Sequence, residues 1–189
     1  MTKDVRPSWH QRLSRSLHLS RSKPESRYVQ LATVGADHKP QNRTVVFRGF
    51  DTNGGALRFI TDKRSAKFTA LYNNPNAEIC WYFSGSREQY RLSGCCKFAS
   101  EKEKNSVWKS LSESSKRQFL WGEPKSKLVD TYTPLSITDE TPPAHFVLVN
   151  VVIENVDYLN LKHGDQGYPH TREIYLKINN EWHCEKVIP

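Results

Sequence analysis

The sequence has no long hydrophobic run, and none of its apolar stretches approaches the ~20 residues that a membrane-spanning helix requires. Residues 1–27 also have no apolar segment of the kind found in secretory signal peptides, so we expect a cytoplasmic protein. In this region Trp9, Leu13 and Leu17 recur at four-residue steps. This spacing predicts an N-terminal helix that docks on the rest of the chain, followed by a linker.

Cysteine is scarce: the chain of 189 residues has four, at positions 80, 95, 96 and 184. They form no Cys-x-x-Cys pair, and the seven histidines have no ligand spacing near them. We therefore expect no zinc site and predict no metal ligands. All four are interpreted as reduced thiols. Because successive strand residues point to opposite faces, one of the adjacent pair Cys95 and Cys96 should be buried and the other at the surface.

Several catalytic patterns are missing. There is no glycine-rich dinucleotide-binding fingerprint and no Ser-His-Asp arrangement, which disfavours a Rossmann enzyme or a hydrolase. The net charge of +8 permits binding of nucleic acid or of an acidic small ligand. The basic residues of segment 101–121 have no interleaved aromatic motif, so a solvated helix face is the simpler interpretation and no nucleic-acid partner is expected.

The sequence does contain many short β patterns separated by turn residues. Closely spaced strands joined by tight turns predict an antiparallel β-barrel. The expected strands are 28–34, 42–47, 56–60, 77–83, 88–100, 144–161, 173–178 and 182–187. The expected helices are 7–21, 66–74 and 101–121, and residues 127–137 could hold a short one.

These elements predict one α+β domain, mainly β, that spans residues 1–189. Segment 101–143 is interpreted as a helical and loop insertion, and 144–189 as the C-terminal strands. Within the insertion, Val107, Leu111 and Leu120 fit a buried stripe on a helix.

The stretch 61–67 combines a strand end with a helix start, and Ser65 is the expected N-cap. Lys63, Arg64 and Lys67 crowd the first helical turn, where the helix dipole disfavours cations. A bound anion would explain them, because free backbone N–H groups, hydroxyls and cations together make a phosphate site. From the spacing alone, a phosphate site and a solvated basic turn remain equally open.

The order and spacing of six segments resemble the pyridoxamine 5′-phosphate oxidase-like flavin-binding split barrels. These segments are 31–34, 40–51, 59–67, 74–75, 87–94 and 182–189. The resemblance implies a split-barrel homodimer that holds FMN at the subunit interface and acts as a flavin-dependent oxidoreductase. The FMN-binding residues that it implies are Arg43, Thr44, Val45, Val46, Arg48, Ile60, Thr61, Ser65, Lys67, Gln89 and, from the partner subunit, Arg172.

Some positions depart from the family pattern. Ala66 stands where the phosphate helix usually has an arginine, and Arg64 is a candidate replacement. In an ungapped register, Val107, Leu111 and Ser115 occupy the positions that bind the substrate phosphate in the oxidase, so two of the three contacts are missing. Near the C-terminus, the family's Arg-x-His is Tyr168-Pro169-His170, which keeps only the histidine as a candidate proton donor.

FMN binding is therefore predicted to be retained, with the vitamin B6 substrate site largely lost and the substrate unknown. One alternative is a genuine pyridoxamine or pyridoxine 5′-phosphate oxidase whose substrate-phosphate site has shifted to other cations, such as Arg48 or Lys162. Another is a non-catalytic flavin-binding module. Arg43 and Arg48 are five residues apart, which places them on opposite faces of a regular strand.

Overall fold

The computed structural model describes residues 6–51, 54–128 and 141–189. The strands are β1 Tyr28–Val34, β2 Pro40–Val46, β3 Ala56–Asp62, β4 Asn76–Phe83, β5 Glu88–Phe98, β6 Phe146–Asn160, β7 Thr171–Ile178 and β8 Glu181–Val187. The α-helices are α1 Ser8–Leu19, α2 Ala66–Asn73, α3 Glu101–Ser110 and α4 Glu113–Arg117, and the 3-10 turns are η1 Pro24–Arg27 and η2 Gln118–Leu120. The predicted α+β class with an antiparallel barrel is confirmed.

The barrel is a sheet in which every neighbouring pair of strands is antiparallel. The order runs β2-β1-β4-β5-β6, and β3 pairs with the first half of β6. The ring closes between β2 and β3, because the Arg48 amide donates to the Arg58 carbonyl at 2.8 Å and the Arg58 amide donates to the Gly49 carbonyl at 2.9 Å. Closure leaves few exposed strand edges.

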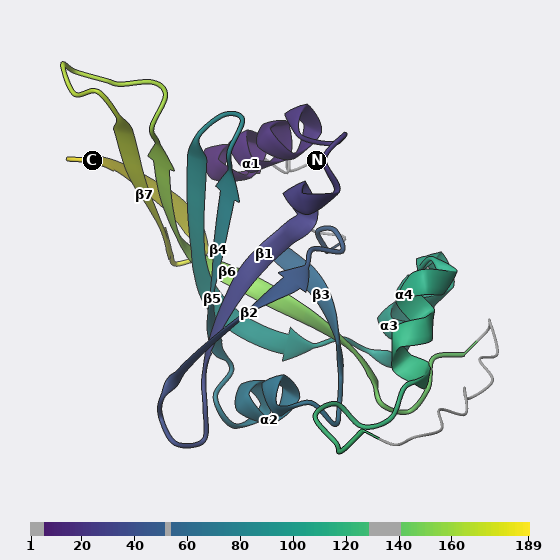
Figure 1. Cartoon of the computed structure of the whole chain (residues 1–189). Coiled ribbons are helices and arrows are strands. Elements are labelled where there is room, and N and C mark those ends of the chain that lie inside the picture. The colour runs from purple at the N-terminus through teal and green to yellow at the C-terminus, as the bar shows by residue number, and fades with distance from the viewer. Residues whose placement is uncertain (1–5, 52–53, 129–140) are drawn as a thin grey trace, which may run out of the picture.

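Strand β6 is long enough to take part in two parts of the sheet. Its residues 146–152 pair with β3, and its residues 155–160 pair with β7, which continues to β8 (Figure 1). The β7–β8 hairpin turns at Asn179 and Asn180, whose φ angles of 51° and 66° are those of a type I′ turn. The sheet thus splits along β6 into the barrel and this hairpin.

A bulge interrupts the pairing of β5 with β6 between Ser93 and Gly94. The two backbones come so close there that a Cβ on Gly94 would lie 2.0 Å from the Val152 carbonyl oxygen. Only glycine fits this close approach, and the bulge increases the local bend of the sheet.

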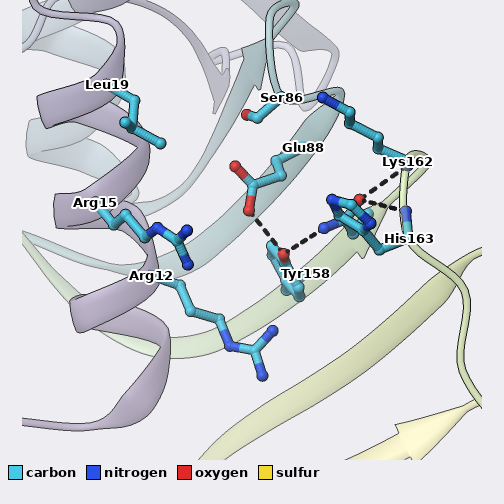
Figure 2. A pocket seen from close by; sticks show the side chains of 9 residues that line it. Arg12, Arg15, Leu19, Ser86, Glu88, Tyr158, Lys162 and His163 are labelled. Atoms are coloured by element: carbon cyan, nitrogen blue, oxygen red, sulfur yellow. Dashed lines mark hydrogen bonds between the residues drawn. The ribbon is translucent and has the colours of Figure 1, made fainter.

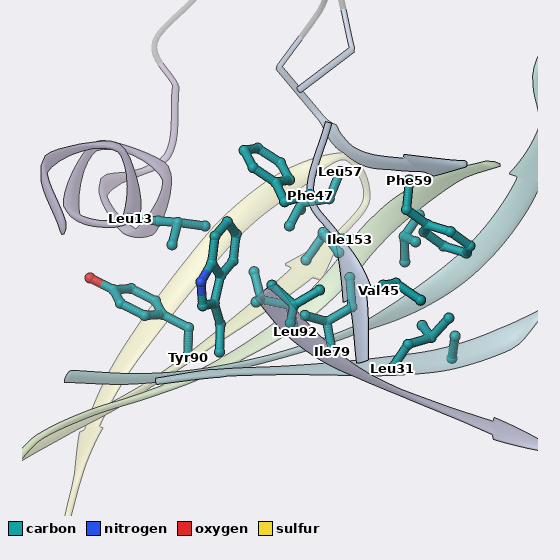
Figure 3. Packing of buried hydrophobic residues seen from close by; sticks show 14 of the residues in the cluster. Leu13, Leu31, Val45, Phe47, Leu57, Phe59, Ile79, Tyr90, Leu92 and Ile153 are labelled. Carbon is teal, nitrogen blue, oxygen red and sulfur yellow. The ribbon is translucent and has the colours of Figure 1, made fainter. Parts of the chain in front are cut away.

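The barrel interior holds the main hydrophobic core, in which alternate residues of the strands point inward (Figure 3). Helix α1 lies against one end of the barrel (Figure 1) and adds Trp9 and Leu13, which are 1% and 0% exposed. The predicted docking helix is therefore confirmed by the placement of these two residues. Of the two adjacent cysteines, Cys96 is buried and Cys95 is half-buried, close to the prediction.

The segment predicted as one helix over 101–121 is in fact broken. Helix α3 ends at Ser110, and Ser112 caps α4 by accepting a hydrogen bond from the Ser115 amide. The break changes which residues are buried, since Trp108 and Phe119 form the second core cluster while Val107, Leu111 and Leu120 are only half-buried. The predicted stripe is therefore right in part, because Val107 and Leu111 pack half-buried against this cluster while Leu120 does not belong to it.

Candidate functional site

The turn between β3 and α2 forms around hydroxyl groups. The Ser65 hydroxyl accepts a hydrogen bond from the Phe68 amide at 3.3 Å, as an N-cap does, and donates to the Asp62 carbonyl at 2.7 Å. The Thr61 hydroxyl lies 3.2 Å from that of Ser65. The predicted cap is therefore confirmed, and the start of α2 presents two hydroxyls beside its free amides.

Lys67 reaches back across the turn, and its ammonium donates to the Thr61 hydroxyl at 2.6 Å. Burial, together with the nearby positive charge of Arg43, lowers the pKa of Lys67 to about 8, although the charge of Asp62 opposes the shift. The charged forms of Lys67 and Arg43 are thus both destabilised at the same place. This indicates an anion site, because a bound anion would offset both the desolvation and the repulsion.

Arg43 lies on β2, opposite Leu31 of β1. Its guanidinium donates to the Thr33 hydroxyl at 2.7 Å and to the side-chain oxygen of Gln41 at 3.1 Å. Burial lowers its pKa as well. Among the described residues, no carboxylate forms an ion pair with Arg43 or Lys67, so both charges are available to a ligand.

A cleft runs over this turn and consists of two adjoining hollows of 620 and 480 Å³. Ser65, Lys67 and Pro124 line both hollows. The larger one continues past the predicted residues Ile60 and Thr61, and the smaller one continues past Arg43. This total volume is in the range of small-molecule and cofactor sites.

Sequence reasoning missed several residues of this cleft. Phe119, Trp121 and Lys125 line it from the segment after α4, and Trp121 is 57% exposed. From its residue type alone Trp121 is a candidate for a cleft wall, but the sequence does not indicate that its segment faces residues 61–67. The predicted short helix over 127–137 lies mostly outside the described residues.

The other two cations of the turn do not line the cleft. Arg64 forms a two-bond ion pair with Asp62, with nitrogen–oxygen distances of 3.0 and 2.7 Å, and Lys63 is exposed. Arg64 is thus committed to Asp62, whose pKa is lowered by these hydrogen bonds despite the opposing effect of burial. The suggestion that Arg64 replaces the missing arginine at Ala66 finds no support in this geometry.

Arg48 also differs from its predicted surroundings. Its side chain donates to the Ser115 hydroxyl on α4 at 3.0 Å, and its Nε is buried without a hydrogen-bond partner among the described residues. It does not line the cleft of Arg43 and Lys67, as expected for two residues on opposite strand faces. Arg48 therefore belongs to the region of the substrate-phosphate position Ser115.

The backbone of β2 between Arg43 and Val46 pairs on one side only. Strand β1 hydrogen-bonds with it, and no strand of the described chain pairs with its other edge over 40–46. Val45 is buried in the core, while Thr44 and Val46 point to the other face. Edge backbone groups of this kind are free to bond a planar ligand.

Gln89, His170 and Arg172 form a second group. Gln89 and Arg172 both stand opposite Leu159 of β6, one on each side. Arg172 forms a two-bond ion pair with Asp157 at 3.0 and 2.7 Å, which raises its pKa. His170 lines a hollow of 240 Å³ with Arg172, and its Nδ1 is buried without a partner among the described residues.

The two groups lie at opposite ends of β6 (Figure 1). Thr61 pairs with Val147, whereas Gln89 and Arg172 pair with Leu159, which follows 12 residues later. At roughly 3.3 Å per residue, these points are about 40 Å apart along the strand. Within one chain, a small ligand bound at one group is therefore remote from the other group along the strand.

Comparison with known proteins identifies the family. Residues 6–100 match the model of the family described as pyridoxamine 5′-phosphate oxidase, FMN-binding domain. The chain belongs to this family. Pyridoxine/pyridoxamine 5′-phosphate oxidase 2 of Arabidopsis thaliana is 33% identical over 165 residues, which cover 82% of this chain and 83% of that protein.

Solved structures agree with this assignment. A pyridoxamine 5′-phosphate oxidase-related, FMN-binding protein from Nostoc punctiforme superposes with a TM-score of 0.86 at 35% identity, covering 98% of this chain and 100% of that one. PhzG from Burkholderia lata shares the fold, with a TM-score of 0.79 at 20% identity and coverage of 98% and 95%. The predicted family, split-barrel fold and FMN cofactor are confirmed, and the chain is a flavoprotein of an oxidoreductase family.

The structure also bears on two further predictions. Within the described residues, no helix is long and apolar enough to span a membrane. In the same part of the chain, no group of three or more His, Cys, Asp or Glu residues is arranged to hold a metal ion.

Proposed function

We propose that the protein is a homodimeric, FMN-dependent oxidoreductase whose two active sites each take residues from both chains. The observation that carries this proposal is the cleft over the β3–α2 turn, where Lys67 and Arg43, without an ion-pair partner among the described residues, lie beside the hydroxyls of Thr61 and Ser65. This donor set fits a phosphate group, and the cleft continues beyond it with room for a ring system.

In the proposed site, Lys67, Arg43 and Ser65 hold the FMN phosphate at the start of α2. The free edge of β2 at Thr44, Val45 and Val46 hydrogen-bonds the flavin ring, and Ile60 provides an apolar contact. Bound FMN supplies the hydride and electron chemistry, while the protein positions it and controls its polarity through these bonds.

The second chain of the dimer completes the site. The 40 Å separation along β6 means that Gln89, His170 and Arg172 can reach the cofactor only from another copy of the chain. Arg172 then bonds the flavin from the partner side, and His170 acts as a proton donor near the reacting atoms.

The substrate differs from a vitamin B6 phosphate in this proposal. Val107 and Leu111 cannot bond a phosphate, and of the three expected contacts only Ser115 keeps a polar side chain. Each charge-assisted hydrogen bond that is lost costs typically ~1.5–3 kcal/mol of binding. A substrate with less negative charge would not incur this cost.

One observation favours a second candidate, a genuine pyridoxine or pyridoxamine 5′-phosphate oxidase. Arg48 bonds Ser115 at 3.0 Å, so a cation does stand at the expected phosphate position although it comes from the segment just after β2. The name of the Arabidopsis relative points in the same direction. Oxygen consumption with pyridoxamine 5′-phosphate would establish this candidate, and its absence would leave the first.

The first experiment is the visible absorption spectrum of the purified protein with added FMN, together with its mass in solution. We expect a flavin spectrum with one FMN per chain and the mass of a dimer. A monomer that binds FMN with full affinity would refute the composite site, and a chain that binds no FMN would refute the proposed function.

A further inference from the structure

A separate cavity of 390 Å³ lies between helix α1 and the ends of β5 and β6 (Figure 2). Arg12, Arg15 and Leu19 line it from α1, and Lys162 and His163 line it from the segment that follows β6. Figure 2 shows the two arginines extending from the helix toward the sheet, with Lys162 and His163 on the far side of the same space. Basic side chains therefore approach the cavity from two independent elements.

The acidic group of the cavity is already satisfied by hydroxyls. Glu88 accepts a hydrogen bond from the Ser16 hydroxyl at 2.7 Å and another from the Tyr158 hydroxyl at 2.8 Å. It forms no ion pair with Arg15 or Lys162. Its carboxylate is thus held at the wall of the cavity by hydroxyls of α1 and β6 and is not bonded to Arg15 or Lys162.

Arg12 is likewise committed to other groups. Its guanidinium forms an ion pair with Glu173 at 3.0 Å and lies 5.0 Å from the centre of the Tyr158 ring. Its role at the cavity is to form a wall, and its charge is largely compensated. The charges that remain are those of Arg15 and Lys162.

Neither Arg15 nor Lys162 has an ion-pair partner among the described residues. A third donor is also available, since the Ser86 hydroxyl is buried and has no hydrogen-bond partner in the described chain. Arg15 and Lys162, which have no ion-pair partner in the described chain, and the hydroxyl of Ser86 thus line the cavity. Leu19 and the ring of Tyr158 add apolar surface, and the remaining walls are polar, from Arg12, Glu88, Asn160 and His163.

This cavity is distinct from the FMN site. Glu88 and Asn160 pair at the far end of β6 from Thr61 and Lys67, so the cavity is remote from the phosphate turn of the same chain. It also lies on the side of β5 where Glu88 points, and the neighbouring residue Gln89 points to the opposite face.

We propose that this cavity binds the phosphate group of a small molecule. Arg15 and Lys162 bind the oxygens from opposite sides, Ser86 donates a third hydrogen bond, and Leu19 with Tyr158 contacts the apolar body of the ligand. Phosphate fits better than a single carboxylate because donors converge on it from three directions. The same donors would accept either a free phosphate ion or a phosphate monoester.

The test is calorimetric titration of the FMN-saturated dimer at low ionic strength with phenyl phosphate and, separately, with inorganic phosphate. Saturation with FMN fills the cations of the β3–α2 turn, so any binding reports another site. We expect one site per chain, and tighter binding of phenyl phosphate if the ligand is an ester. Equal affinities would identify the free ion as the ligand.

The variants Arg15→Gln and Lys162→Gln should each weaken binding about tenfold, as loss of one charge-assisted bond predicts. The control Lys102→Gln removes an exposed cation from α3 and should leave the affinity unchanged. The Arg15→Gln variant should also keep its full FMN content. Absence of saturable binding of both probes, or equal affinity of Arg15→Gln and the unaltered protein, would overturn the proposal.

Discussion

Lys67 combines two properties that are rarely found together in an unliganded lysine. It is half-buried, and a second cation, Arg43, lies near it, with no carboxylate of the described residues bonded to either. Folding alone gives no reason for this arrangement, because both effects raise the free energy of the charged form. In the proposed site, the phosphate of FMN would supply the missing negative charge.

Lys67→Ala should therefore weaken FMN binding by about 10- to 100-fold, the range expected for one charge-assisted bond. Riboflavin has the same ring system but no phosphate, so its affinity should hardly change. Quenching of flavin fluorescence measures both affinities. Equal losses for FMN and riboflavin would mean that Lys67 supports the ring or the fold and does not bind the phosphate.

The affinity for FMN should fall as the pH rises above about 8. In the free protein, Lys67 has a pKa of about 8, below its usual 10.5, and FMN binding requires its charged form. A proton must then be taken up on binding, which lowers the affinity by up to about tenfold per pH unit. In Lys67→Arg, whose side chain stays charged, the affinity should be constant to pH 10. A constant affinity in the unaltered protein would contradict the assignment.

For single residues, the sequence predicts some side-chain contacts correctly and gives no indication of others. The separation of Arg43 from Arg48 follows from strand alternation and is confirmed by their different contacts. The pairing of Arg64 with Asp62 was not predicted, because three cations near a helix start look alike until the side-chain directions are known.

Among the elements, α1 depends most on tertiary contacts. Its buried residues Trp9 and Leu13 pack at the end of the barrel, and polar groups beneath it bond Ser16 and Arg12. Short helices are marginal in water on their own, so packing must supply most of its stability.

Leu13→Ala should therefore lower the free energy of unfolding by about 2–5 kcal/mol, the cost of truncating a fully buried leucine. The matched control is Leu19→Ala on the same helix, where the side chain is 61% exposed and the loss should be below about 1 kcal/mol. Urea denaturation followed by tryptophan fluorescence measures both. Similar losses would show that α1 is not docked as described.

Strands and short helices were predicted almost to the residue because alternation, proline and glycine mark their limits. The helices of segment 101–121 were not predicted correctly, since the hydrophobic pattern alone did not reveal that Ser112 caps a new helix. The break changes the direction of every later side chain, which brings Phe119 to the core and to the cleft.

For the whole molecule, the decisive feature is the length of β6. The sequence indicated a long β segment, but neither the pairing of β3 with its first half nor that of β7 with its second half can be read from one chain's pattern. Register depends on contacts between distant segments. The family resemblance implies only that Arg172 comes from the partner subunit; that Gln89 lies at the same end of β6, away from the β3–α2 turn, was visible only in the structure.

Arg172→Ala should lower FMN affinity about tenfold in the dimer, as the loss of one charge-assisted bond predicts. The control is Arg91→Ala, because Arg91 also contacts Asp157, at 3.5 Å, and belongs to the same sheet. FMN titration of both variants distinguishes a direct bond from Arg172 to the cofactor from an indirect effect through Asp157. Equal losses would mean that the arginines act by holding Asp157, and that Arg172 makes no bond to the cofactor.

The separation of the two groups along β6 has a genetic consequence in the proposed dimer. There, a chain carrying Lys67→Ala and a chain carrying Arg172→Ala would place both defects in one site when they pair, which would leave the other site entirely native. Two alleles that each fail at low FMN would thus complement each other, and reassembled mixed dimers would regain half of the normal flavin capacity.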